Sequence, residues 1–180
     1  MDKLNFRPLK ANEIEVRIDR LYENYACLLL YQNARCAMDI LDETVGAMNW
    51  QRIHSRDNAN CTIFIWDSEK GTWVGKEDTG KESRTEAEKG LASDSFKRAA
   101  VNWGIGRELY TAPEIKIPTS LMNVKTGNNG KLACYDEFIV GKIEYLKGSI
   151  TCLTIINKTE SQKRKELVPV FVMKPEEKSA

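Results

Sequence analysis

Three short strand-like runs follow one another between residues 49 and 78 and strongly restrict how this part of the chain can fold. The runs read NWQRIHS, CTIFIWD and TWVGKED, and they are rich in the β-branched and aromatic residues typical of strands. Only short polar linkers, 56–60 and 68–71, separate them. Linkers of this length join antiparallel neighbours, so we expect a β-meander.

The longest helical segment follows the meander, over residues 84–103, and ends before the glycines at 104 and 106. Residues that share one side of a helix recur at intervals of three or four. Small and aromatic side chains follow this spacing at Ala92, Phe96, Ala99, Ala100 and Trp103. We therefore expect an amphipathic helix whose apolar side packs on the meander.

Shorter patterned segments flank these elements. We expect amphipathic helices over 11–21 and 34–46, and a strand over 25–32. Two further strand-like runs, 138–146 and 149–156, meet at a Lys-Gly pair that is typical of a hairpin turn. The sequence therefore predicts an α+β fold, with an antiparallel β-meander packed on a long amphipathic helix and an additional C-terminal β-hairpin.

The end of the chain is more polar than the rest. Residues 158–180 contain a charged stretch, one short apolar run and a charged tail, and no internal repeat is visible anywhere. We therefore expect one core domain over residues 1–157 and a partly ordered C-terminal extension over 158–180.

Charge and composition exclude several classes of protein. Of the 180 residues, 42% are hydrophobic and 29% are charged, which excludes a fibrous or wholly disordered chain. Lysine and arginine together number 27, against 26 for aspartate and glutamate. A nucleic-acid site must therefore be a local feature and cannot follow from overall charge.

The sequence also bears on the compartment. No apolar run reaches the length of about 18 residues that a membrane span needs. No apolar stretch follows the charges at the start, as it would in a secretory leader. The five cysteines are an odd number without CxxC spacing, which favours free thiols in a reducing environment. We therefore expect a cytoplasmic protein with no membrane partner.

A stretch in the third strand-like run, GKEDTGK at 75–81, nearly spells a nucleotide-binding phosphate loop. Glu82 stands where that loop needs a hydroxyl to bind Mg²⁺. Glu77 and Asp78 would place carboxylates against the phosphates. We therefore expect neither an ATP site nor a cofactor.

Catalytic groups are scarce. His54 is the single histidine, and the sequence pattern brings no nucleophile to it. A set of acidic residues could bind Mg²⁺ as in a nuclease, but lysines and arginines are interspersed among them, as on a solvated face. The set comprises Glu77, Asp78, Glu86, Glu88 and Asp94. We do not expect an enzyme, and a Mg²⁺-dependent nuclease stays open as an alternative.

A local basic groove is the remaining option. Basic and acidic residues balance over 76–108, so only their positions could create such a groove. Ser93 lies one helical turn before Lys97, and a small side chain there lets a phosphate backbone approach the lysine. Arg98 either serves a neighbouring phosphate or pairs with Asp94. Aromatic side chains could stack bases, but alternation with polar residues favours core packing for most of them.

Three blocks of residues carry a more specific pattern. The first is Glu77-Asp78-Thr79-Gly80, the second is Ser93-Asp94-Ser95-Phe96-Lys97-Arg98-Ala99, and the third runs from Gly104-Ile105-Gly106 to Leu109-Tyr110. They resemble the signature of the Rad52 single-strand annealing family, which reads E-D-x-G, then (S/T)-D-x-x-K-R-A, then a glycine-rich exit into L-Y. Upstream, Arg35 and the segment 46–50 are similar to a further family block, so the resemblance covers about residues 12–112.

The resemblance implies how the chain folds, assembles and binds DNA. Proteins of this family have a twisted antiparallel sheet packed on a long helix, and they form homo-oligomeric rings or helical filaments. Single-stranded DNA lies in a groove around the outside, without ATP. By position, Lys97 and Arg98 look like the paired basic residues of the groove floor, and Arg35 looks like the basic residue of its upper wall. Further candidates for DNA contact are Lys89, Lys81 and Arg84.

The function implied is ATP-independent binding of single-stranded DNA and annealing of complementary strands in homologous recombination and DNA repair. The length is similar to that of the phage or prophage branch, the Sak-type proteins. That branch implies the cytoplasm of a bacterial host and a single-strand-binding protein as a candidate partner. Besides the nuclease, a module that coats single strands without annealing them stays open.

Overall fold

The computed structural model describes residues 4–81, 87–127 and 130–175, and residues 87–89 by their backbone alone. The chain divides into two compact units: Met1–Leu9 with Gln32–Arg107, and Lys10–Tyr31 with Glu108–Ala180. This division leaves untested the predicted annealing core, 1–157, and extension, 158–180. Within the described residues, no helix combines the length and apolarity that crossing a membrane requires.

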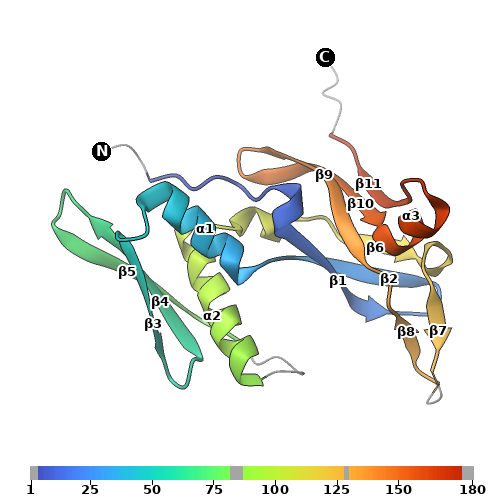
Figure 1. The fold of residues 1–180 in the computed structure, drawn as a ribbon, viewed down its shortest axis with the longest axis horizontal. Coiled ribbons are helices and arrows are strands. Elements are labelled where there is room, and N and C mark those ends of the chain that lie inside the picture. The colour runs from blue at the N-terminus through green and yellow to red at the C-terminus, as the bar shows by residue number, and fades with distance from the viewer. Residues whose placement is uncertain (1–3, 82–86, 128–129, 176–180) are drawn as a thin grey trace. The chain divides into compact units, whose positions relative to one another are not determined.

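A three-stranded antiparallel sheet forms one half of the first unit (Figure 1). Its strands are β3 (Trp50–Ser55), β4 (Asn60–Asp67) and β5 (Thr72–Thr79), in that order. The predicted meander is therefore confirmed. The turn between β3 and β4 has three successive residues with positive φ, Arg56, Asp57 and Asn58, and Asp and Asn tolerate this conformation well.

Helix α2 (Ala87–Trp103) packs on one face of this sheet, which we call the inner face. Strand alternation turns Cys61, Ile63 and Ile65 of β4 toward α2, and all three are buried. From the helix, Phe96 is fully buried in return. The separation of polar and apolar sides predicted for this helix is weak. The first residues of the predicted helix, 84–86, lie outside the described residues.

Helix α1 (Ala34–Val45) contacts both α2 and β3 within the same unit, and it confirms the helix expected over 34–46. Its start is capped by Asn33, whose side-chain oxygen accepts a hydrogen bond from the Arg35 amide at 2.8 Å. Its end is set by Gly46, which has a φ of 86° that favours glycine.

The second unit is built on a six-stranded sheet of order β11-β10-β9-β1-β2-β6. Its strands are β1 (Ile14–Leu21), β2 (Tyr25–Gln32), β6 (Ile115–Pro118), β9 (Phe138–Leu146), β10 (Ser149–Asn157) and β11 (Pro169–Met173). The short elements are the 3-10 turns η1 (Ala11–Glu13), η2 (Arg107–Thr111) and η3 (Thr119–Leu121), the strands β7 (Val124–Thr126) and β8 (Leu132–Cys134), and helix α3 (Lys158–Arg164). Strand β2 confirms the strand expected over 25–32.

The helix predicted over 11–21 is wrong, because most of this segment is strand β1. Ile14, Val16 and Ile18 alternate with charged residues, so a two-residue period coexists with the helical spacing on which the prediction relied. β-branched side chains favour the strand, and pairing with β9 and β2 fixes it.

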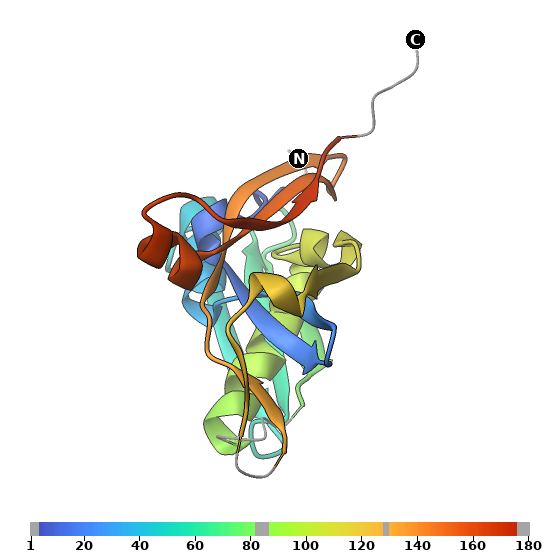
Figure 2. The same ribbon diagram turned by 90° about the vertical axis from the view of Figure 1, so that its right-hand side faces the viewer.

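The C-terminal segment contributes strands to this sheet (Figure 2). β9 and β10 pair antiparallel across Lys147 and Gly148, both with positive φ, and β11 pairs with the other edge of β10. Helix α3 is capped by Asn157, whose fully buried side chain donates to the Asp136 carboxylate at 2.9 Å and accepts from the Glu160 amide at 3.0 Å. These bonds fix the start of α3, and pairing with β10 fixes β11.

Candidate nucleic-acid interface

Lys97 and Arg98 are neighbours on α2 with different surroundings. Both side chains are half-buried. Within the part of the chain that the structure describes, the Lys97 ammonium makes no hydrogen bond or ion pair. The Arg98 Nε lies 3.4 Å from Asp78 Oδ1 and forms an ion pair with it. Among the described residues, Lys97 is therefore a cation without a partner, which we call uncommitted, whereas part of the Arg98 charge is offset.

The motif Glu77-Asp78-Thr79-Gly80 ends β5 and joins it to α2. Because strand side chains alternate, Glu77 and Asp78 lie on opposite faces of the sheet. Glu77 accepts hydrogen bonds on the outer face from Asn60 and Thr62, each at 2.9 Å. Asp78 lies on the inner face, where α2 packs. The first family-like block is thus a connection between sheet and helix.

Gly80 belongs to the same connection and lies very close to the main chain of α2. A Cβ at residue 80 would lie 2.5 Å from the Ser95 amide nitrogen and 2.9 Å from the Leu91 carbonyl oxygen. One residue later, the Lys81 amide donates to Asp94 Oδ2 at 2.9 Å. The first and second family-like blocks therefore contact each other directly.

The third family-like block contacts Gln32. Gln32 is the first residue of 32–107, the longer of the two segments that make up this unit. Its Nε2 donates to the Lys97 carbonyl at 3.5 Å and to the Ile105 carbonyl at 3.4 Å. A Cβ at residue 106 would lie 2.5 Å from Gln32 Oε1, and Gly106 has a φ of 71°. Glycine is therefore required at residue 106, because the backbone has a positive φ there and because Gln32 leaves no space for a side chain.

Arg35 belongs to the same unit as Lys97 and Arg98. It occupies the first turn of α1 and is exposed, and within the described residues its guanidinium makes no hydrogen bond or ion pair. Gln32 is three residues before it and is bonded to the Lys97 main chain, so this tie links the α1 N-terminus to the middle of α2. The structure thus brings the segments that carry the three leading candidates into one unit.

The other predicted basic residues are less well placed. Lys81 is exposed, and its amide is bonded to Asp94. Lys89 lies in the first turns of α2, but its side chain is outside the described residues, as is all of Arg84.

Two further cations of this region hold the C-terminus of α2. Lys76 Nζ donates to the Asn102 carbonyl at 2.9 Å and lies 4.4 Å from the centre of the Trp103 ring. Arg107 donates to the Val101 and Asn102 carbonyls. Cations at this position satisfy the free carbonyls and the negative end of the helix dipole. These contacts within the fold explain the positions of both cations, and no contact with DNA is needed to explain them.

Arg52 is a cation that sequence reasoning missed. It lies on the inner face of β3, is exposed, and places its guanidinium 4.8 Å from the centre of the Phe96 ring on α2. The signal was available, because residue 52 alternates with Trp50 and His54 on the face that meets the helix. Arg52 thus adds positive charge beside α2.

The segment 75–81, whose sequence is close to that of a phosphate loop, does not form such a loop in the structure. Residues 75–79 are extended in β5 and paired with β4, so their amides serve the sheet and do not form a cradle. Lys81, which stands where the loop has its phosphate-binding lysine, is exposed, and its amide is bonded to the Asp94 carboxylate.

The acidic residues proposed for a nuclease whose side chains are described, Glu77, Asp78 and Asp94, do not form a metal site. Glu77 and Asp78 lie on opposite faces, and Asp94 holds the Lys81 amide. Among the residues whose side chains are described, no group of three His, Cys, Asp or Glu could hold a metal ion. Glu86 and the Glu88 side chain lie outside that set.

Nucleophilic chemistry has little support at His54. Ser95 Oγ lies 3.5 Å from His54 Nδ1, but it is fully buried and donates to the Asn58 carbonyl at 3.0 Å. Burial and the nearby Arg52 lower the pKa of His54 below its ordinary value. Burial raises the pKa of the Cys61 thiol to about 11, so the thiolate needed for attack is scarce. All five cysteines are free, as predicted.

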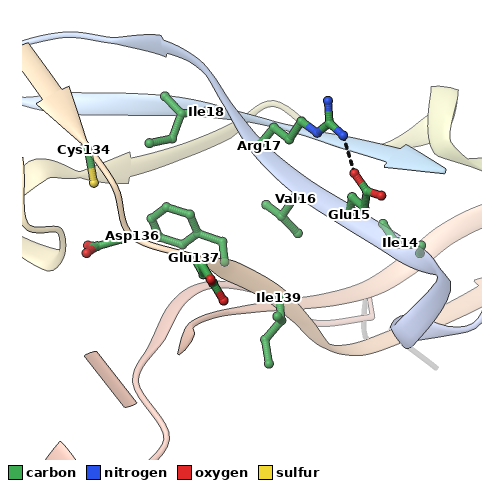
Figure 3. Close-up of a pocket in the computed structure, with 10 residues that line it drawn as sticks. Ile14, Glu15, Val16, Arg17, Ile18, Cys134, Asp136, Glu137 and Ile139 are labelled. Carbon is green, nitrogen blue, oxygen red and sulfur yellow. Dashed lines mark hydrogen bonds and ion pairs between the residues drawn. The ribbon is translucent and has the colours of Figure 1, made fainter. Parts of the chain in front are cut away.

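A hollow in the second unit lies between β1 and the segment 134–139 (Figure 3). Arg17 is the one basic residue among those that line it, and it is paired with Glu15. Asp136 and Glu137 line the other side. With this excess of carboxylates, the hollow is unsuited to a phosphate backbone.

The sequence model of the Rad52/22 family of double-strand break repair proteins matches residues 38–128. The matched stretch begins inside α1 and contains the meander, α2 and all three family-like blocks, whereas Arg35 lies just before it. No curated protein and no solved structure matches the chain. Because the match spans half of the chain and coincides with the connections between sheet and helix, the chain belongs to the Rad52/22 family of double-strand break repair proteins.

Proposed function

We propose that the protein binds single-stranded DNA along α2 and anneals complementary strands in DNA repair and recombination. The observation that carries this proposal is the pair Lys97 and Arg98. It stands half-exposed on α2, with one cation uncommitted, inside the segment that matches a family of DNA repair proteins. Arg35 on α1 is the third residue that we assign to the DNA.

Binding of this kind suits annealing. Contacts between cations and the phosphate backbone carry no base-sequence information, so the bases stay free to test a second strand. The proposal requires neither ATP nor an enzymatic step, and residues 75–79 are extended in β5 instead of forming a phosphate loop. We assign no cofactor and no metal.

We further propose that the active form is a homo-oligomer, either a ring or a helical filament. Proteins of the Rad52 family bind single-stranded DNA and form oligomers. A modest cationic site repeated in every subunit gives avidity that one nearly neutral chain lacks. The phage branch, the host cytoplasm and a single-strand-binding protein as partner stay predictions from the resemblance.

The test is annealing of two labelled complementary oligonucleotides, followed by fluorescence transfer, with the double variant K97A/R98A. We expect a loss of at least tenfold in annealing rate at moderate salt. The matched control is K163A/R164A, because it also removes a Lys-Arg pair from a helix, but from α3 in the second unit. Equal rates for wild type and K97A/R98A would contradict the site.

The coating module is the second candidate, since the same cations would serve it. It predicts that the protein protects single strands from a nuclease but leaves the rate of pairing at the protein-free value. The nuclease alternative predicts fragments of a labelled strand that form only when Mg²⁺ is added.

A further inference from the structure

Asp78 and Arg98 form an ion pair that links β5 to α2, at the site assigned to DNA. Its two side chains are partly exposed, 29% for Asp78 and 40% for Arg98. We propose that Asp78 is a positioning residue, which holds Arg98 by its Nε so that its two terminal nitrogens are presented to a DNA phosphate. This inference rests on the proposed function and adds how Arg98 is oriented toward the phosphate.

The contact uses one part of the guanidinium. Arginine has five N–H donors in a planar fork, and four of them are on the terminal nitrogens. Only Nε contacts Asp78, at 3.4 Å from Oδ1. Within the described residues, the terminal nitrogens make no hydrogen bond. No described residue therefore occupies the fork that binds phosphate in a bidentate manner.

Asp78 is itself held in place from both elements. Its Oδ1 accepts a hydrogen bond from the Thr79 amide at 2.7 Å, and its Oδ2 accepts one from Asn102 Nδ2 at 3.4 Å. Asn102 Nδ2 also donates to the Glu77 carbonyl at 2.9 Å. The carboxylate is thus fixed without help from Arg98, as a positioning group must be.

Two effects of Asp78 on DNA binding oppose each other. Its negative charge repels phosphate and offsets part of the Arg98 charge, although a partly exposed pair is worth little in Coulomb energy. Its contact restricts a long flexible side chain before DNA arrives, so less conformational entropy is lost on binding. Positioning predicts that loss of the carboxylate weakens binding, whereas repulsion predicts that it tightens binding.

The experiment measures binding of a fluorescein-labelled 30-nucleotide oligo-dT by anisotropy, at three salt concentrations. The variants are D78N, R98A and D78N/R98A. We expect D78N to weaken binding by about fivefold in the wild-type background, the scale of one ordered arginine. In the R98A background we expect no weakening, because nothing remains for Asp78 to position. A merely structural role would weaken binding equally in both backgrounds.

Asp39→Asn is the matched control for charge. Asp39 is an exposed carboxylate of the same unit, on α1, and it has no bond to Arg98. Asp39→Asn removes the same charge as D78N, so unchanged or slightly tighter binding is expected. If D78N does not fold, Asp78→Glu replaces it. That variant keeps the charge but displaces the carboxylate by one methylene, and we again expect a loss of about fivefold.

The outcomes separate this inference from the proposed function. If wild type does not bind oligo-dT, both are wrong. If R98A weakens binding while D78N and Asp78→Glu match wild type or bind more tightly, the proposed function stands and the positioning role is wrong. Equal losses from D78N in both backgrounds would also overturn the role of Asp78.

Discussion

Gly80 lies so close to the Ser95 main chain that a methyl group at residue 80 would come within 2.5 Å of the Ser95 amide nitrogen. The contact joins the end of β5 to the middle of α2, two residues before Lys97. Backbone on the helix cannot move aside as a flexible side chain can. The spacing between sheet and helix in the first unit therefore depends on the absence of a side chain at this residue.

Replacing Gly80 with alanine is expected to lower the free energy of unfolding by about 2 kcal/mol, because α2 must move away from β5. Urea unfolding at equilibrium measures this. Gly75→Ala is the control on the same strand, since its Cβ would meet the Phe64 ring, a side chain that can rotate. We expect a change under about 1 kcal/mol there. Equal losses for the two variants would contradict the argument.

Gly106 and Gln32 form a second close pair, and they should be coupled energetically. Gly106→Ala forces a positive φ on alanine, which costs about 1 kcal/mol, and also displaces the Gln32 amide. Gln32→Ala makes room for the new methyl group. The double variant should therefore lose about 1 kcal/mol less than the sum of the single losses. Strict additivity in urea unfolding would show that the two side chains do not compete for space.

Lys97 and Lys76 allow a comparison within one unit. Lys97→Ala removes an uncommitted cation, so the slope of log affinity for oligo-dT against log salt should become shallower by about 0.7 for each phosphate that is no longer neutralised. Lys76→Ala removes a cation that holds the Asn102 carbonyl and the Trp103 ring, so it should lower stability and leave the slope unchanged. A shallower slope for Lys76→Ala alone would reverse the assignment.

The local elements of the first unit were predictable because their signals are local. Alternation over residues 50–79 and short polar turns specify the meander, and an Asn cap with a closing glycine specifies α1. The division into two units was not predictable. It depends on pairing between β1 and β9, such as Glu15 with Ile139, and no local pattern encodes partners so far apart in the sequence.

The residues of the candidate site were predictable from the sequence, but the contacts between them were not. Sequence reasoning offered Asp94 as a partner for Arg98, because residues four apart are neighbours on a helix. In the structure Asp94 is occupied by the Lys81 amide, and the partner is Asp78, on a strand twenty residues earlier. A contact between a strand and a helix depends on how the two elements pack, which spacing along one element does not show.

His54 should make the fold sensitive to mild acid. Burial and then the charge of Arg52 lower its pKa in the folded state below 6.5, so the folded protein resists a proton that the unfolded chain accepts. Its contribution to stability is complete above pH 6.5 and falls as pH drops toward the folded pKa. Because His54 is the single histidine, one imidazole resonance in an NMR titration measures that pKa.

Urea unfolding between pH 7.5 and 5 provides the second measurement for His54. Wild type should lose stability over this range, and His54→Gln should flatten that loss, because the glutamine does not titrate. A folded pKa at or above 6.5, or parallel pH profiles for the two proteins, would contradict the sign of the shift.

The outer face of the meander offers a test of assembly. Trp66 and Trp73 lie there with ring centres 5.5 Å apart, and each is more than a third exposed. Strand alternation places Ile53 on the same face, 55% exposed, and no lysine or arginine of β3, β4 or β5 lies there. Exposed aromatic and aliphatic side chains on a face without cations are unsuited to a phosphate backbone and suit a protein partner.

In a chain whose family forms oligomers, we expect this face to contact a second copy. W66Q/W73Q should therefore lower the mass measured by light scattering after size exclusion, toward the 20.5 kDa of one chain. Met48→Gln is the control, because Met48 is an 88% exposed apolar side chain of the same unit but lies outside the sheet. An unchanged mass for the double variant, with wild type oligomeric, would place the subunit contact elsewhere on the molecule.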